Sequence, residues 1–138
     1  MSDLFENLVY AKEDVITFPE GIPGFETHKK FVLVKVPEHE PFEWLVCITN
    51  VKLRFAVINP LVFMPDYDPP VTKSQMAPLQ LEKPEEMLIY VIITLKDNLL
   101  DSTANMIGPL FVNPRKMIGR QVVIDSDKYS VQERVIRT

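Results

Sequence analysis

The chain holds few residues of the types that carry out nucleophilic chemistry. It has one cysteine, Cys47, and two histidines, His28 and His39. A nucleophilic site needs a Ser, Cys or Thr held beside a base, with a third group that orients the base. Cys47 lies in the apolar stretch 44–49, where a thiol stays protonated and packs as a small hydrophobic side chain. Nothing in the spacing recommends a pair of Cys47 with either histidine, so we expect Cys47 in the core.

Sequence patterns typical of metal or phosphate sites are also weak in this chain. The densest cluster of metal-ligand types is Glu-His-Glu at 38–40, with His28 upstream. Successive residues of an extended loop point in different directions, so this cluster predicts a solvated connection. Asp-Ser-Asp at 125–127 lacks the glycine and the distal Glu of a calcium loop. The 4 glycines are scattered and open no phosphate-binding loop, which excludes Rossmann and P-loop nucleotide sites. We expect no catalytic residue, metal or cofactor.

Acidic segments point to recognition rather than catalysis. Asp66, Tyr67 and Asp68 place an aromatic ring between two charges. Prolines on both sides hold this loop in a conformation with little entropy to lose on binding. The pattern predicts a partner-binding loop, with an ordinary rigid crossover loop as the alternative. The acidic residues next in line for the same role are Glu82, Glu85 and Glu86.

The charge of the chain argues against contact with nucleic acid. It has 15 basic and 19 acidic side chains and a formal net charge of −4 at pH 7, the wrong sign for a protein that binds phosphate backbones. Residues 1–101 hold 9 Lys and Arg against 16 Asp and Glu, net −7, whereas residues 102–138 hold 6 against 3, net +3. An acidic face that meets a basic partner explains this asymmetry, and so does an unevenly charged solvated surface.

Length and hydropathy predict one domain, residues 1–138, with no membrane span. A chain of 138 residues with 46% apolar side chains removes roughly 68–70% of its unfolded surface from water without help from disulfides or metals. The longest apolar stretch, 87–95, falls far short of the roughly 20 residues of a membrane helix. The acidic N-terminal stretch MSDLFENLVY lacks the apolar region of a secretory signal. We therefore expect a cytoplasmic location.

Short apolar blocks rich in Val, Ile, Phe and Tyr, separated by Pro, Asn and Asp, predict a mostly β fold. The longest helical candidate is 71–77, and a further helical turn is expected at 83–86. Closing the sheet removes its edges, so we expect a closed or partly open antiparallel β-barrel in preference to a two-sheet sandwich. The expected strands are 8–11, 15–18, 31–36, 44–49, 55–58, 87–95, 103–107, 110–112 and 121–124.

Three asparagines are expected to have structural roles. Asn59 and Asn113 each end an apolar strand and precede a proline, which is typical of an Asn side chain that caps its own backbone. Asn105 interrupts the block 103–107 with an amide whose two donors and one acceptor need partners. We expect Asn105 to bond an irregular neighbouring segment such as 21–25. The alternative is a surface position in direct contact with a partner.

Several segments together resemble the flagellar assembly factor family FliW. They are ITFPEGIPGF at 16–25, FAVINPLVFMPDY at 55–67, STAN at 102–105 with PLFVN at 109–113, and GRQVVI at 119–124 with Tyr129. The segments follow the order of the family from residue 5 to about residue 130. Four segments in order across nearly the whole chain make the resemblance specific.

The resemblance implies a small β-barrel-like protein of the bacterial cytoplasm that has no catalytic activity. Such proteins bind CsrA, a dimeric RNA-binding repressor of translation, and keep it off its messages, including the one for flagellin. They also bind flagellin, so that accumulating flagellin frees CsrA and shuts down its own synthesis. Composition alone would not identify these partners.

Two other readings of the sequence stay open. A small β-barrel that carries a cofactor, for instance an enzyme of the flavin-binding split-barrel type, has similar size and β content, and it would be yellow when purified. A β scaffold that binds some other protein differs from the FliW reading only in its partner. Co-purification with the two expected partners separates these readings.

Overall fold

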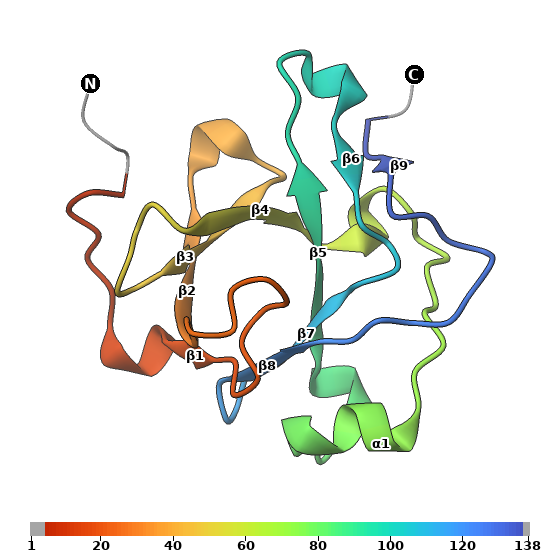
Figure 1. Cartoon of the computed structure of the whole chain (residues 1–138), viewed down its shortest axis with the longest axis horizontal. Coiled ribbons are helices and arrows are strands. Elements are labelled where there is room, and N and C mark those ends of the chain that lie inside the picture. Colours follow the sequence, from red (N-terminus) through yellow and green to blue (C-terminus); the bar gives the residue numbers. More distant parts are fainter. Residues whose placement is uncertain (1–4, 137–138) are drawn as a thin grey trace.

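The computed structural model describes residues 5–136 and consists mainly of short strands (Figure 1). One short α-helix, α1 (Lys73–Met76), and several 3₁₀ turns accompany them. The strands are β1 (Ile16–Thr17), β2 (Lys30–Lys35), β3 (Glu43–Cys47), β4 (Arg54–Ile58), β5 (Leu88–Thr94), β6 (Thr103–Ala104), β7 (Leu110–Asn113), β8 (Ile118–Gln121) and β9 (Glu133–Arg134).

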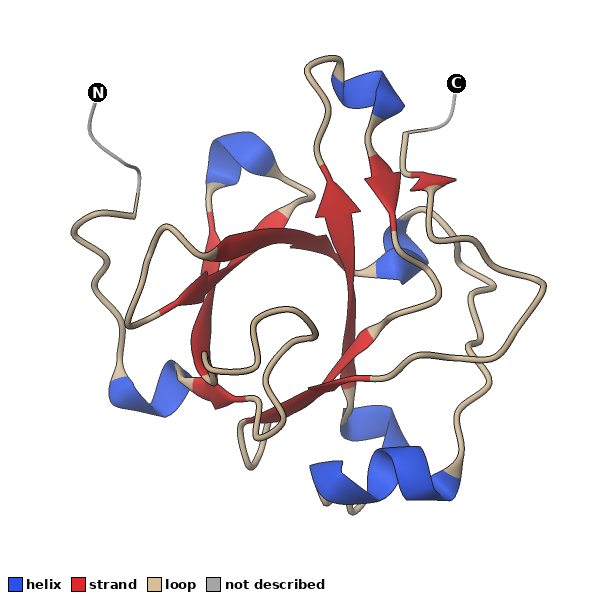
Figure 2. Cartoon of the chain, viewed as in Figure 1, coloured by secondary structure: helices blue, strands red, loops and turns tan. Residues whose placement is uncertain are grey.

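Seven of the strands close into a barrel, which Figure 2 shows as a ring. The order is β4-β3-β2-β1-β8-β7-β5, and β5 returns to pair with β4. Every pairing around the ring is antiparallel except that of β1 with β8, where Thr17 lies opposite Ile118. The expected mostly β, barrel-like fold with short helical turns is confirmed, with this one parallel contact as an addition.

The strand β5 pairs with three other strands of the sheet. Its residues pair with β7 at 88–90, with β4 at 91–93 and with β6 at 93–94. The N–H of Asn105 bonds the carbonyl of Ile92 at 3.0 Å, after which residues 106–109 leave the ladder before β7 begins. The two-residue strand β9 pairs with β6 outside the ring. An irregular segment therefore separates the barrel from a small outer extension.

Side chains that alternate along the strands fill the barrel and cover its outside. Phe31 and Leu33 of β2 pack in the interior with Phe18, whereas Val32 and Val34 pack outside against Phe5. This matches the two faces expected from period-2 alternation. The rings of Phe18 and Phe31 meet edge to face with 5.6 Å between their centroids. The interior is therefore a packed core of apolar side chains.

The segment between β1 and β2 crosses the mouth of the barrel in the view of Figure 1. Its Ile22 is buried in the interior cluster. Gly21 has φ +69°, and a Cβ there would lie 2.5 Å from the Cα of Glu26. Gly119 of β8 is equally constrained, because a Cβ would lie 2.5 Å from the ring of Phe18. Glycine at these two positions lets the chain pass over the mouth and lets Phe18 fill the core.

Three expected strands differ from the structure. The strand expected at 103–107 is shortened to β6 at Thr103–Ala104, because residues 106–109 leave the sheet. Residues 8–11 form no strand: the ring is complete without them, and Val9 is 92% exposed. The strand expected at 121–124 is β8 at Ile118–Gln121, because the irregular segment 106–109 faces the following residues. Val122 and Ile124 still donate to the carbonyls of Pro109 and Ile107 at 3.0 and 2.9 Å. The strand β9 was not expected at all, since two residues carry no pattern.

The helical expectations at 71–77 and 83–86 are confirmed with shifted ends. Thr72 and Gln75 form a reciprocal capping box at the start of α1. The chain continues as the 3₁₀ helix η4 (Ala77–Leu79), which contains Pro78. A second 3₁₀ turn, η5 (Pro84–Glu86), precedes β5. No helix within residues 5–136 is long and apolar enough to cross a membrane.

Candidate partner-binding surfaces

The acidic loop at 65–70 follows the 3₁₀ helix η3 (Pro60–Val62) and is fixed to the body by its aromatic residue. Asp66 and Asp68 are exposed, but Tyr67 is only 6% exposed. The hydroxyl of Tyr67 donates to the carbonyl of Met106 at 2.7 Å. Its ring meets that of Tyr129 edge to face, with 4.8 Å between centroids. Tyr67 faces the core, so the two carboxylates are what this loop offers to a partner.

The tyrosine pair also fixes the far side of the loop. The hydroxyl of Tyr129 accepts a hydrogen bond from the backbone N–H of Asp68 at 3.0 Å. Burial, reinforced by the neighbouring Tyr129, raises the pKa of Tyr67 well above its usual range, so Tyr67 stays a neutral donor. The two rings thus hold the loop in one shape, which favours binding at low entropic cost.

The second acidic segment contains Glu82, Glu85 and Glu86, and its charge is partly neutralised by Arg115. Arg115 lies 3.1 Å from Glu82 and 3.6 Å from Glu86. The third member, Glu85, is exposed on η5. Exposed ion pairs contribute little to stability. Because Arg115 pairs with Glu82 and Glu86, Glu85 is the acidic residue of this segment most available to a cationic partner.

Asn113 joins the barrel to the segment that follows α1. It is 2% exposed, and its Nδ2 donates to the carbonyls of Leu79 and Gln80 at 2.8 and 3.3 Å. Its Oδ1 accepts from the N–H groups of Arg115 and Lys116 at 3.0 and 3.3 Å. A buried amide with all these partners fixes the turn after β7 and the end of η4 together.

Asn59 and Asn105 bond their own backbone neighbourhoods. The side chain of Asn59 accepts from the N–H of Leu61 at 3.0 Å and caps η3. The Oδ1 of Asn105 accepts from the N–H groups of Ile107 and Gly108 at 3.0 and 3.1 Å. The segment that Asn105 holds is therefore the irregular stretch 106–109 beside it, not 21–25 as expected. An Asn side chain reaches N–H groups two and three residues ahead more readily than a distant loop.

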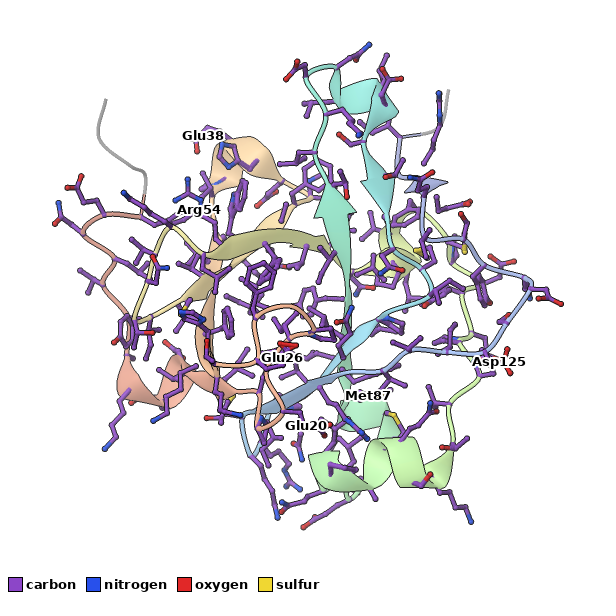
Figure 3. All side chains as sticks on the ribbon, viewed as in Figure 1. Glu20, Glu26, Glu38, Arg54, Met87 and Asp125 are labelled. Carbon is purple, nitrogen blue, oxygen red and sulfur yellow. The ribbon has the colours of Figure 1, made fainter. Side chains whose placement is uncertain are left out.

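An apolar groove of about 410 Å³ lies beside α1, and Lys73 is the one charged residue that lines it. Its walls include Met76, Leu81 and Met87, and Figure 3 labels Met87 close to α1. Methionine side chains adapt to irregular partners. Sequence reasoning did not identify this groove, because its walls come from turns whose packing has no sequence period.

The residue types that could do chemistry have ordinary structural surroundings. Cys47 is fully buried, as expected, and its Sγ lies 3.3 Å from Oγ1 of Thr49. His39 Nδ1 accepts a hydrogen bond from Nε1 of Trp44 at 3.0 Å. Among the described residues, no group of three or more His, Cys, Asp and Glu side chains is arranged to hold a metal ion.

One carboxylate at the barrel rim is unusual. Desolvation raises the pKa of Glu43 on β3, against the lowering effect of Lys35. Burial, followed by the nearby Glu43, raises the pKa of Tyr90 on β5 to about 12. The Oε1 atom of Glu43 is buried without a hydrogen-bond partner in the described residues. A hydrogen bond between the side chains of Tyr90 and Glu43 also lowers the pKa of Glu43, so this half-buried carboxyl group has one neutral partner.

Comparison with known proteins gives a consistent result. The family model described as FliW protein matches residues 1–135. A flagellar assembly factor FliW from Thermoanaerobacter pseudethanolicus is 36% identical over 96% of this chain and 89% of its own length. Another, from Caldanaerobacter subterraneus subsp. tengcongensis, is 37% identical over 92% of this chain and 85% of its own length.

The fold agrees with that of a solved structure. A crystal structure of the flagellar assembly factor FliW superposes with a TM-score of 0.88 at 30% identity, covering 95% of this chain and 92% of that chain. The structural match therefore extends over nearly the whole chain.

Proposed function

Because the chain belongs to the FliW family of flagellar assembly factors, we propose that it works as a non-catalytic partner switch in the bacterial cytoplasm. In this role it binds the translational regulator CsrA, lowers the affinity of CsrA for its messages, and releases CsrA when flagellin binds. Synthesis of flagellin is then coupled to its consumption in assembly. The observation that carries the proposal is the family match over residues 1–135.

The geometry supports partner binding through charge. Asp66 and Asp68 are exposed on a loop that Tyr67 and Tyr129 hold in place. Complementary charge speeds the encounter with a basic RNA-binding protein and selects against acidic partners. The net charge of −4 also repels RNA, so the protein competes for the regulator rather than for the message.

A gel-shift titration tests the CsrA arm. CsrA is held at a concentration that shifts a flagellin leader RNA, and the protein is added in increasing amounts. We expect the shifted band to disappear and the protein alone to give no shift. A shift by the protein alone, or a CsrA shift unchanged in large excess of the protein, contradicts the proposal.

A second titration tests the flagellin arm. Monomeric flagellin is added to the mixture in which the protein has already displaced CsrA from RNA. We expect the CsrA shift to return as flagellin occupies the protein. If flagellin co-purifies with the protein but the shift does not return, the two partners are not exchanged and the switch is wrong.

A further inference from the structure

Large apolar side chains are exposed on the turn that follows β5. Leu95, Leu99 and Leu100 are 39%, 53% and 46% exposed, and two of them belong to the 3₁₀ helix η6 (Leu99–Asp101). The Asn98 side chain accepts from the N–H of Leu100 at 3.1 Å, which fixes the shape of the turn. Burying apolar area contributes roughly 25 cal/mol per Å², so three exposed leucines on one fixed turn favour a contact surface.

A groove of about 310 Å³ lies between this turn and the 3₁₀ helix η2 (Pro37–His39). Its apolar walls are Phe42, Trp44, Leu95 and Leu99. The volume is at the lower end of the range for ligand pockets, roughly 300–1,000 Å³. It therefore suits one or two side chains of a peptide better than a large cofactor.

The rim of this groove is negative. Glu38 and Glu40 line it and are exposed, and Figure 3 shows Glu38 on η2. No Lys or Arg is among the residues that line the groove. On the opposite turn, Asp101 is paired with Arg134 at 3.7 Å, and the adjacent Lys96 and Asp97 carry opposite charges. Lys35 lies beside Glu40 in the adjoining hollow, but within the groove itself the two glutamates are the acidic lining and no Lys or Arg offsets them.

The aromatic wall is held in place before any partner arrives. Nε1 of Trp44 donates to His39 Nδ1 at 3.0 Å, and the centroid of the Trp44 ring lies 5.8 Å from that of Phe5. A fixed ring loses little entropy on binding. The face of a tryptophan is also the most favourable aromatic surface for a cation. The groove thus combines an apolar wall that includes a tryptophan ring with an acidic rim.

We propose that this groove docks a segment of a partner protein in which an Arg or Lys is flanked by apolar side chains. The apolar side chains pack on Leu95 and Leu99, and the cation lies against Trp44 between Glu38 and Glu40. An acidic segment would meet the rim with like charge, and a second copy of this chain brings a net charge of −4. The proposal rests on the proposed function in that it assumes a basic protein partner, and it adds a contact site separate from the loop at 65–70.

The chain supplies its own reporter, because Trp44 is its single tryptophan. The probe is a short synthetic peptide of alternating leucines and arginines, with a matched peptide that has glutamate in place of arginine. We expect the arginine peptide to change the fluorescence of Trp44 saturably and the glutamate peptide to leave it unchanged. No saturable change, or equal changes with both peptides, overturns the proposal.

Variants locate the response. Glu38→Gln with Glu40→Gln removes two rim charges, and we expect it to weaken binding of the arginine peptide about tenfold. The matched control, Asp125→Asn with Asp127→Asn, removes the same charge from another exposed segment, and we expect the wild-type affinity. Leu99→Ala should also weaken binding, because it removes an exposed apolar wall. Equal affinities of the rim and control variants would show attraction to net charge alone and would also refute the groove.

The same variants are then titrated with CsrA to separate this inference from the proposed function. We expect the rim variant to bind CsrA about tenfold more weakly than wild type. If wild type does not bind CsrA, the proposed function fails, and the groove is judged by the peptide result alone. If wild type and the rim variant bind CsrA equally well, the groove is not the site for this partner.

Discussion

The interior of the barrel and the cluster outside it are held together in different ways. The interior cluster consists of apolar side chains from regular strands, such as Phe18, Phe31 and Leu45. The outer cluster packs Tyr67, Tyr129 and Met106 against the outside of β4 and β5. Its segments are irregular, so hydrogen bonds from side chains to backbone replace the missing ladder. The acidic loop at 65–70 therefore depends on a few polar contacts rather than on the barrel core.

The largest expected effect is in the interior. Phe18→Ala removes a fully buried ring that packs under Gly119, and we expect it to lower the free energy of unfolding by about 3–5 kcal/mol. Urea denaturation followed by circular dichroism measures this change. The control Val9→Ala, at an exposed position, should stay within about 0.5 kcal/mol of wild type. If Phe18→Ala lowers the free energy of unfolding less than Asn105→Ala does, the interior is not the more strongly stabilised of the two regions.

Asn105→Ala should have the next largest effect. It leaves the N–H groups of Ile107 and Gly108 without their acceptor, at an expected cost of about 1–3 kcal/mol. Any loss of partner binding should follow the loss of folded protein. Denaturant melts run beside a binding titration test this. Normal stability with impaired binding would show that Asn105 contacts the partner directly.

Tyr67→Phe tests the hydrogen bonding of the outer cluster by removing a single oxygen atom. The ring stays, but the carbonyl of Met106 loses the hydroxyl at 2.7 Å, and we expect a loss of about 1–2 kcal/mol in unfolding free energy. Amide hydrogen exchange should rise first in the segments at 65–70 and 106–109, while β2 and β3 stay protected. Uniform loss of protection across both regions would mean that the outer cluster and the barrel unfold as one unit.

The smallest effect on stability is expected at the acidic loop itself. Asp66→Lys with Asp68→Lys changes two exposed charges, and we expect less than about 0.5 kcal/mol change in unfolding free energy. Binding of CsrA should nevertheless weaken, because two attractive charges become repulsive. Isothermal titration of the double variant with CsrA measures this. Unchanged affinity would move the contact away from this loop, with Glu85 as the next residue to reverse.

The sequence predicted the regular strands of the barrel better than the irregular segments of the outer cluster. The pattern of short apolar blocks identified β2, β3, β4 and β5, because each of these strands buries one or both faces. The same pattern could not place β9, which has only two residues, or the end of β8, after which the chain faces the irregular stretch 106–109. The burial of Tyr67 was also beyond reach, since its partner Met106 is 39 residues away in the sequence. The groove at Trp44 joins two turns distant in sequence, and only the closed barrel brings them together.

The single parallel contact of the ring has a consequence for how the protein is made. Thr17 pairs with Ile118 where β1 joins β8. The strand β1 therefore completes its pairing only after β8 has formed. Contacts between residues so far apart in sequence form slowly, and the ring cannot be completed before Ile118 has been synthesised. Until then, unpaired strand edges are open to other chains. The barrel can therefore close only after β8 has been made.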